Sequence, residues 1–271
     1  MYFLIILLTV SFISCKKDSV KEKQPIKIAV DVQPQKMTYS VGDKFDPVGL
    51  AITVTYQGGD TKTITYPNND IHFDYDFTKV STSVGDKTVS IFYKDTKTTL
   101  KVTVTPPDVT INYDGNLIII PWGTSSCAKR GISFTPGDPW TTDPNAMDTD
   151  KILGLPDYNF ETDENYVTLG RNGVIVVEMG AYFTDDKGFD IYVFEVGPIV
   201  EATKVEVSAD LNKWIYVGNA EGSLSGIDMN GKVPKGAKYK YIRLTDIRTS
   251  SDITYPGADI DAIVVLHPTF K

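Results

Sequence analysis

The sequence predicts an all-β chain of two β-sandwich domains in tandem. Its 271 residues are enough for two domains of ordinary size, and its 15 tyrosines with frequent Thr and Val match the composition of strands. Long helical runs of Ala, Leu, Glu and Lys are absent. Short apolar runs, many of them alternating with polar residues, recur between Gly, Pro and Asp breaks instead. We therefore expect domains at residues 26–105 and 106–271 behind an N-terminal leader.

The leader is the apolar segment 1–14, MYFLIILLTVSFIS, which is too short to span a membrane as a helix. It is typical of the apolar core of an export signal peptide. Phe12-Ile13-Ser14-Cys15 resembles a lipobox, in which the Cys is lipidated and becomes the mature N-terminus. The resemblance implies lipidation at Cys15 and a lipidated tether over residues 15–25. An ordinary secretory signal cut elsewhere is the alternative.

Charge and location are linked. The net charge is −8, which argues against a nucleic-acid partner and against a face for anionic membranes. Lys16-Lys17-Asp18 directly follows Cys15 and suggests a sorting signal. We expect a protein of the bacterial cell envelope, lipid-anchored in the outer membrane and surface-exposed.

The second cysteine, Cys127, has no partner if Cys15 carries lipid, and is then either a buried inert thiol or a reactive one.

The first domain is predicted from alternating runs. Residues 26–105 contain about seven short strands, the spacing of a sandwich. Three motifs resemble the bacterial Ig-like domains of surface proteins: the run Tyr39-x-x-Gly42-Asp43-x-Phe45, the turn Gly85-Asp86-Lys87, and the closing Leu100-x-Val102-x-Val104. The resemblance implies a spacer or adhesion module over residues 26–105 rather than a catalyst.

The second domain has strands at similar spacing, which predict another sandwich, a jelly roll. About thirty residues after Pro121 look irregular, and the segment 138–164 holds eight carboxylates against Lys151. It is either functional or an acidic solvated loop. The motifs Gly154-x-Pro156-Asp157, Val207-Ser208-x-Asp210-x-x-x-Trp214 and Gly257-x-Asp259-x-Asp261-Ala262 resemble galactose-binding-like and discoidin-like jelly rolls of bacterial surface proteins. That resemblance implies glycan or cell-surface binding, often with a structural calcium.

A cation site is predicted around two apolar runs, 188–195 and 257–266, which read as central strands covered on both faces. Asp259 and Asp261 are two residues apart, so they share a strand face with Ile263 and Val265. Two adjacent carboxylates repel unless a cation lies between them. Asp190 and Asp157 complete the predicted calcium ligands. Arg243 or turn amides are the alternative partners, and Glu195 is expected on the face opposite Asp190.

Aromatic residues are the candidate ligand-binding residues, because sugar rings stack on Trp and Tyr. Trp122 and Trp140 lie in loop-like sequence and are predicted to contact a ligand, with a local loop plug as the alternative for each. Trp214 follows a turn and is expected in the core.

The predicted function is a lipid-anchored surface protein in which an Ig-like spacer presents a jelly roll that binds a glycan or a protein. A purely structural or assembly component without a small ligand is the first alternative, and a glycan hydrolase is the second. We predict no catalytic residues and no enzymatic activity. His72 and His267 are the only histidines, and no carboxylate pair suits glycoside hydrolysis.

Overall fold

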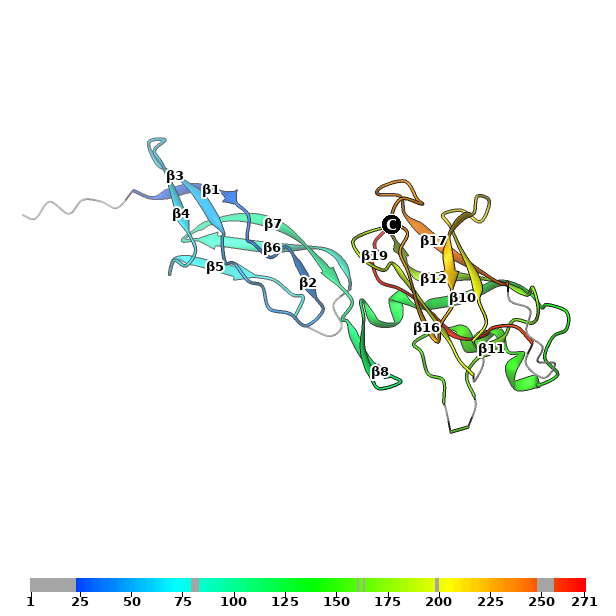
Figure 1. Ribbon diagram of the computed structural model, residues 1–271. Coiled ribbons are helices and arrows are strands. Elements are labelled where there is room, and N and C mark those ends of the chain that lie inside the picture. Colours follow the sequence, from blue (N-terminus) through cyan, green and yellow to red (C-terminus); the bar gives the residue numbers. More distant parts are fainter. Residues whose placement is uncertain (1–22, 79–82, 160, 163, 198–199, 248–255) are drawn as a thin grey trace, which may run out of the picture. The chain divides into compact units, whose positions relative to one another are not determined.

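The computed structural model describes residues 23–78, 83–159, 161–162, 164–197, 200–247 and 256–271 (Figure 1). The predicted signal peptide, Cys15 and most of the tether lie outside these residues. The described chain is all-β, with nineteen strands and three short 3-10 helices and no α-helix. None of its helices has the length and apolarity needed to cross a membrane. The predicted fold class is confirmed.

The N-terminal strands form two small sheets. Three strands make an antiparallel sheet in the order β1-β3-β4, and four make a mixed sheet in the order β2-β7-β6-β5. Their bounds are β1 Pro25–Val32, β2 Thr38–Ser40, β3 Ala51–Tyr56, β4 Thr61–Thr65, β5 Ile71–Asp74, β6 Gly85–Tyr93 and β7 Thr96–Thr105. Burial alternates along β6 as the period of a strand requires, which is why these runs could be identified from the sequence.

The Cα positions divide the chain into two compact units. The described residues of the first are 23–36, 46–75 and 88–100, and the second holds residues 37–45, 76–78, 83–87 and the described residues from 101 onward. Within the second unit, Tyr39 packs against Phe45 and Phe77 at ring-centroid distances of 5.9 and 5.0 Å. The predicted boundary at residues 105 and 106 remains a prediction. We call residues 106–271 the C-terminal sandwich.

The larger sheet of the C-terminal sandwich has six strands. Five follow the order β10-β12-β17-β14-β15, and β19 pairs with β12 beside that path. The bounds are β10 Ala128–Thr135, β12 Val174–Phe183, β14 Thr203–Ser208, β15 Ile215–Ala220, β17 Tyr239–Asp246 and β19 Pro268–Thr269. Alternate side chains of its central strands enter one core cluster, which includes Val177, Val205, Val207, Ile242 and Leu244.

The smaller sheet has four strands in the order β11-β18-β13-β16. The bounds are β11 Val167–Thr168, β13 Ile191–Glu195, β16 Leu224–Ile227 and β18 Asp259–Val265. Ile191, Val193 and Ile263 enter the same core cluster as the larger sheet, so the two sheets form a sandwich.

A hairpin covers the other face of the smaller sheet. Strands β8 (Val109–Tyr113) and β9 (Asn116–Ile120) turn at Asp114-Gly115. Tyr113 and Ile120 share a second apolar cluster with Phe194 and Val264. Strand β18 is therefore buried on both faces over its whole length, as its continuous apolar run predicts.

The predicted irregular stretch after Pro121 is partly wrong. Residues 121–127 include the 3-10 helix η1 (Gly123–Ser126), but Ala128–Thr135 form strand β10 at the edge of the larger sheet. Its sequence, AKRGISFT, carries few apolar residues because an edge strand needs little burial. The acidic segment beyond it forms η2 (Pro144–Ala146) and η3 (Thr149–Ile152), which the carboxylates of Asp143 and Asp148 cap.

Candidate functional site

The two strands that carry the predicted cation ligands run antiparallel. Ile191 pairs with Val265, and Glu195 pairs with Ile260. Asp190 therefore lies beside Leu266, whose N–H donates to the Asp190 carbonyl at 2.8 Å. Asp259 lies at the other end of the pair. Asp190 and Glu195 are five positions apart along the chain, which at about 3.4 Å per position in a strand is roughly 17 Å. The structure does not bring Asp190 together with Asp157, Asp259 and Asp261 in one site.

Asp190 is fully buried at the start of β13 and is satisfied by backbone amides. Its two carboxylate oxygens accept the N–H of Asp186 at 2.9 Å and of Met229 at 2.7 Å. Burial raises the pKa of Asp190, and these two hydrogen bonds oppose the increase. Turn amides, one of the alternatives left open by the sequence, are thus its partners.

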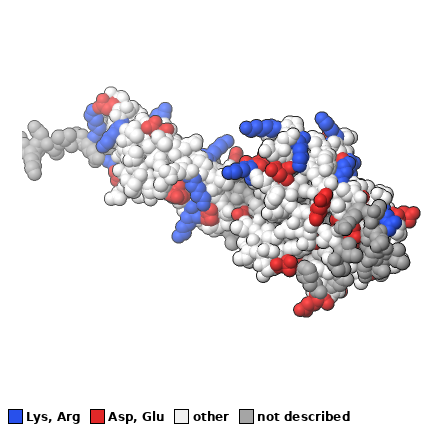
Figure 2. Space-filling model, in the orientation of Figure 1, with Lys and Arg blue, Asp and Glu red and all other residues white. Residues whose placement is uncertain are grey.

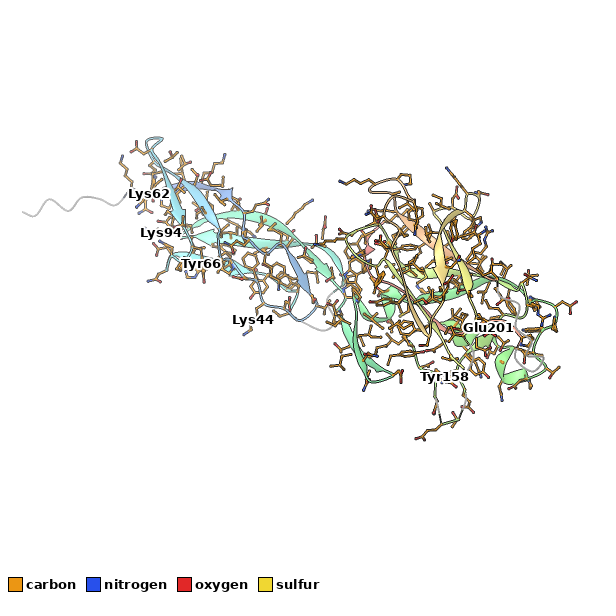
Figure 3. All side chains as sticks on the ribbon, in the orientation of Figure 1. Lys44, Lys62, Tyr66, Lys94, Tyr158 and Glu201 are labelled. Carbon is orange, nitrogen blue, oxygen red and sulfur yellow. The ribbon has the colours of Figure 1, made fainter. Side chains whose placement is uncertain are left out.

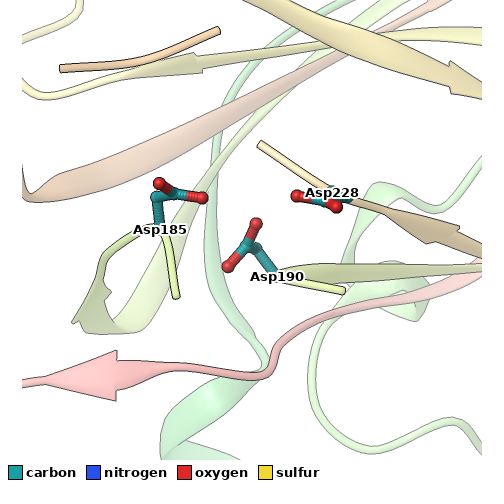
Figure 4. Close-up of side chains that lie close together, drawn as sticks. All are labelled: Asp185, Asp190 and Asp228. Carbon is teal, nitrogen blue, oxygen red and sulfur yellow. The ribbon is translucent and has the colours of Figure 1, made fainter. Parts of the chain in front are cut away.

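Two further carboxylates point toward Asp190, as Figure 4 shows. Carboxylate oxygens of Asp185, Asp190 and Asp228 lie within 4.8 Å of one another. Asp185 Oδ1 is buried and has no hydrogen-bond partner among the described residues. Three convergent carboxylates are a donor set suited to Ca²⁺. The sequence did not indicate Asp185 or Asp228, because only the pairing of Ile191 with Ile227 places Asp228 next to Asp190.

At the other end of β13, Asp261 and Glu195 are also held by amides. Asp261 Oδ1 accepts the N–H of Asp157 at 3.1 Å, and the N–H of Tyr158 also bonds to this carboxylate. Glu195 Oε1 accepts the N–H of Glu201 at 2.7 Å. Tyr158 and Glu201 are labelled in Figure 3. Two loops are thereby fixed to neighbouring buried strands.

In each of these two carboxylates, the second oxygen accepts no hydrogen bond from the described residues. Glu195 Oε2 and Asp261 Oδ2 are buried and have no hydrogen-bond partner among the described residues. The side chains are 2% and 1% exposed. Burial raises the pKa of Glu195 to about 9 and that of Asp261 to about 7. Glu195 is therefore protonated at neutral pH.

A β-bulge explains why the expected faces are wrong here. Phe194 pairs with Ala262 but Glu195 pairs with Ile260, so Asp261 is the extra residue. Ile260 and Ile263 consequently enter the same core cluster, which strict alternation forbids. Asp261 does not share their face, and Glu195 is brought to Asp259, whose N–H bonds to its carboxylate.

The two loop tryptophans are half-buried and packed into the fold. The ring of Trp122 lies 4.6 Å from that of Phe270 between centroids. Trp140 donates its Nε1–H to the carbonyl of Thr168 at 2.8 Å and packs edge-on against Phe134. These contacts favour the loop-plug alternative. A ligand-binding role for Trp122 or Trp140 remains a prediction.

Cys127 is buried, which raises its pKa to about 12 and leaves the thiol unreactive.

The outer face of the six-stranded sheet carries a group that the sequence did not indicate. Arg243 pairs across the sheet with Glu206, and Glu206 with Tyr216. Arg243 Nε donates to Glu206 at 2.7 Å, and its guanidinium carbon lies 4.4 Å from the Trp214 ring centroid. Lys204 Nζ lies 2.9 Å from Glu206 and 6.0 Å from the Tyr216 ring centroid. Trp214 is half-buried on this face rather than in the core.

A second group lies on the same sheet. Glu178 on β12 pairs with Arg130 at 2.6 Å and with Lys240 at 3.8 Å. Lys240 Nζ lies 5.1 Å from the ring centroid of Tyr182. Glu178 pairs with Tyr241 and Glu206 with Arg243, which are two residues apart on β17, so both groups lie on one face of the sheet. We call this surface the outer sheet face and define it by the two groups, namely Arg130, Glu178, Tyr182, Lys204, Glu206, Trp214, Tyr216, Lys240 and Arg243.

Comparison with curated proteins finds one short similarity. The chain is 35% identical over 77 residues to an exo-beta-1,6-galactobiohydrolase of Bifidobacterium longum subsp. longum. The aligned segment is 27% of this chain, but it spans only 5% of that relative.

Solved structures that align with about half of the chain include two isolated domains. The C-terminal domain of a chitobiase from Bacteroides fragilis is 12% identical, with 58% of this chain and 99% of that chain covered and a TM-score of 0.29. CBM32-3 of a family 31 glycoside hydrolase from Clostridium perfringens is 14% identical, with coverages of 52% and 92% and a TM-score of 0.30. At these TM-scores the likeness says nothing about what the chain binds.

The N-terminal strands have a clear family. Residues 32–104 match the bacterial Ig-like domain (group 3), within the predicted range of 26–105. Strands β2–β6 lie inside this segment and β7 extends one residue beyond it, whereas β1 enters it only at Val32. Residues 32–104 are therefore a bacterial Ig-like domain of group 3.

Proposed function

We propose that the chain is a non-catalytic protein of the bacterial cell surface, in which the C-terminal sandwich binds a glycan and the Ig-like domain is a spacer. One observation carries the proposal. Trp214, Tyr216 and Tyr182 lie on one sheet face, each beside a cationic side chain. Aromatic rings stack on sugars while charged groups bind hydroxyls, which is the composition of a sugar-binding surface.

Two further points support binding rather than catalysis. The most perturbed carboxyl groups, Glu195 and Asp261, are almost fully buried, so a glycosidic bond has no access to them. The short similarity to an exo-beta-1,6-galactobiohydrolase supports a setting in which glycans are bound, but its extent is too small to transfer an activity.

The proposal includes attachment through Cys15, which lies outside the described residues. The apolar segment 1–14 and the lipobox-like Phe12-Ile13-Ser14-Cys15 support it. A lipid-anchored chain partitions into the detergent phase of Triton X-114, and Cys15→Ser shifts it to the aqueous phase. Recovery of the wild-type chain in the aqueous phase would refute the anchor but leave glycan binding intact.

We also propose a structural calcium ion at Asp185, Asp190 and Asp228. The convergence of their oxygens supports this group over the set Asp157, Asp259 and Asp261, which forms no such cluster among the described residues. In that set, the Asp261 carboxylate accepts the backbone N–H of Asp157, and the Asp259 carboxylate accepts from Thr168 Oγ1.

A glycan array probed with the Cys15→Ser full-length chain tests glycan binding. We expect binding to at least one glycan class, weakened about tenfold or more by Trp214→Ala or Tyr216→Ala because a stacking ring is lost. Phe189→Ala is the matched control for Tyr216→Ala, since Phe189 is as exposed as Tyr216 but precedes β13 in the other sheet. No binding to any glycan would favour the alternative of a structural or assembly component.

A further inference from the structure

The charges of the outer sheet face do not cancel. Glu206 is shared between Lys204 and Arg243, and the hydrogen bonds of both cations outweigh burial and lower the pKa of Glu206. One carboxylate neutralises one of the two cations. This group therefore keeps one unit of positive charge, beside the rings of Trp214 and Tyr216.

The second group repeats the arrangement on β10, β12 and β17. Glu178 is shared between Arg130 and Lys240, so one unit of positive charge remains here too. Beyond the two groups, Lys129 lies close enough to Lys240 to help lower its pKa, after the larger effect of burial. At the opposite rim of the face, Glu221 accepts a hydrogen bond from Asn219. The negative charge of Glu221 and the positive charge of Lys129 offset each other.

This local excess is opposite in sign to the net charge of the whole chain, which carries 35 Asp and Glu against 27 Lys and Arg. In Figure 2, most Lys and Arg side chains on the visible side of the C-terminal sandwich lie along its upper edge, with Asp and Glu directly beneath them and again toward the lower end. A locally positive surface attracts an anionic ligand at short range even where the net charge of the protein is negative.

The two groups are close enough for one ligand to contact both. Glu178 pairs with Tyr241 and Glu206 with Arg243, two residues further along β17. The two glutamates are therefore about 12 Å apart, from about 10 Å across the sheet and about 7 Å along it. An extended chain lying across the strands meets both groups and the intervening Tyr241, which pairs with Glu178. One polymer that carries acidic groups at intervals therefore contacts two cationic centres and the aromatic rings together.

We propose that the ligand of the outer sheet face is an anionic polysaccharide, one whose sugar units carry carboxylate or sulfate groups. The proposal rests on the proposed glycan-binding function and names its ligand class. A nucleic acid fits less well, because its backbone charge is dense, about one charge per 1.7 Å of duplex, whereas the face offers two excess charges on a net-negative chain.

Affinity electrophoresis of the Cys15→Ser full-length chain tests the ligand class, with polygalacturonate, dextran sulfate, neutral dextran and neutral galactan in the gels. We expect retardation by the two acidic polymers, weakened about threefold to tenfold by Arg243→Gln and by raising the salt concentration. Lys62→Gln, an exposed lysine of β4 in the Ig-like domain, is the control and leaves retardation unchanged.

The carboxylate variants make the test specific to charge. Glu178→Gln and Glu206→Gln each free one cation from its neutralising partner, so both variants bind the acidic polymers more tightly, whereas damage to the fold weakens binding. Retardation by neutral polymers alone overturns the anionic class but leaves glycan binding standing. Absence of retardation together with a blank glycan array overturns both. Stronger binding to duplex DNA than to either acidic polymer overturns the polysaccharide assignment.

Discussion

The carboxylate of Asp261 accepts the backbone N–H of Asp157 at 3.1 Å, across 104 residues of sequence. The bond joins a loop to the central strand β18. The same device recurs where Asp246 accepts the N–H of Asn172 at 3.0 Å and of Ala258 at 3.1 Å. Buried carboxylates of this sandwich are thus held largely by loop amides, and each fixes loop backbone to a strand.

Asp261→Ala is expected to lower the free energy of unfolding by about 2–4 kcal/mol, because two amide N–H groups lose their acceptor inside the protein. Asp261→Asn costs less, since its carbonyl oxygen still accepts both bonds. Urea unfolding followed by Trp fluorescence measures the difference. Equal losses for both variants would show that the carboxylate charge, rather than its acceptor oxygen, stabilises the loop.

Stability is expected to fall as the pH rises from about 5 to 9. The folded pKa of Glu195 is raised from 4.5 to about 9 by burial, and that of Asp261 from 3.8 to about 7. A raised pKa means that the folded state holds the proton more tightly than the unfolded state does. The stabilisation is therefore complete below the unfolded pKa and is lost as the pH rises through the folded value.

Glu195→Gln separates this effect from the titration of other groups. Gln keeps the acceptor for the Glu201 N–H but cannot ionise. We expect similar stability of the variant and the wild type near pH 5 and a more stable variant near pH 9. Chemical denaturation across that range is the measurement, and parallel profiles for the two proteins would contradict the assignment to Glu195.

The sequence predicts those elements whose own residues show the apolar or alternating pattern that burial requires. β18 is apolar on both faces and β6 alternates, so both were identified from local pattern. β10 was missed because an exposed edge strand needs no apolar pattern. The carboxylate partners were missed for a different reason. The antiparallel register places Asp190 and Asp259 at opposite ends of the strand pair, and the bulge at Asp261 turns its side chain away from the face expected from alternation. Neither feature leaves a local signal in the sequence.

Calcium is expected to raise the Tm of the chain, and a chelator to lower it. A ligand at about 100 times its Kd stabilises the folded state by about 2.7 kcal/mol. Asp228→Asn should abolish the response without unfolding the protein, because Asp228 is exposed while its oxygen belongs to the group with Asp185 and Asp190. Asp74→Asn, on the exposed side of β5, is the matched control. An unchanged Tm in calcium and in chelator would exclude a structural ion at this group.

Two glycines of the C-terminal sandwich should respond very differently to a methyl group. A Cβ at Gly173 would overlap the carbonyl oxygen of Leu169, and backbone on both sides cannot move away cheaply. Gly173→Ala is therefore expected to cost about 3 kcal/mol or more.

A Cβ at Gly226 would lie 2.6 Å from the ring of Phe189, a side chain at the surface that is 52% exposed. Gly226→Ala should then cost under about 1 kcal/mol. Thermal unfolding of both variants measures the contrast. The physical reason lies in what the new methyl group meets, since a carbonyl oxygen fixed by the chain gives way far less than a side chain at the surface. A large loss at Gly226 would mean that the Phe189 ring is itself part of the packing that holds β16 to β13.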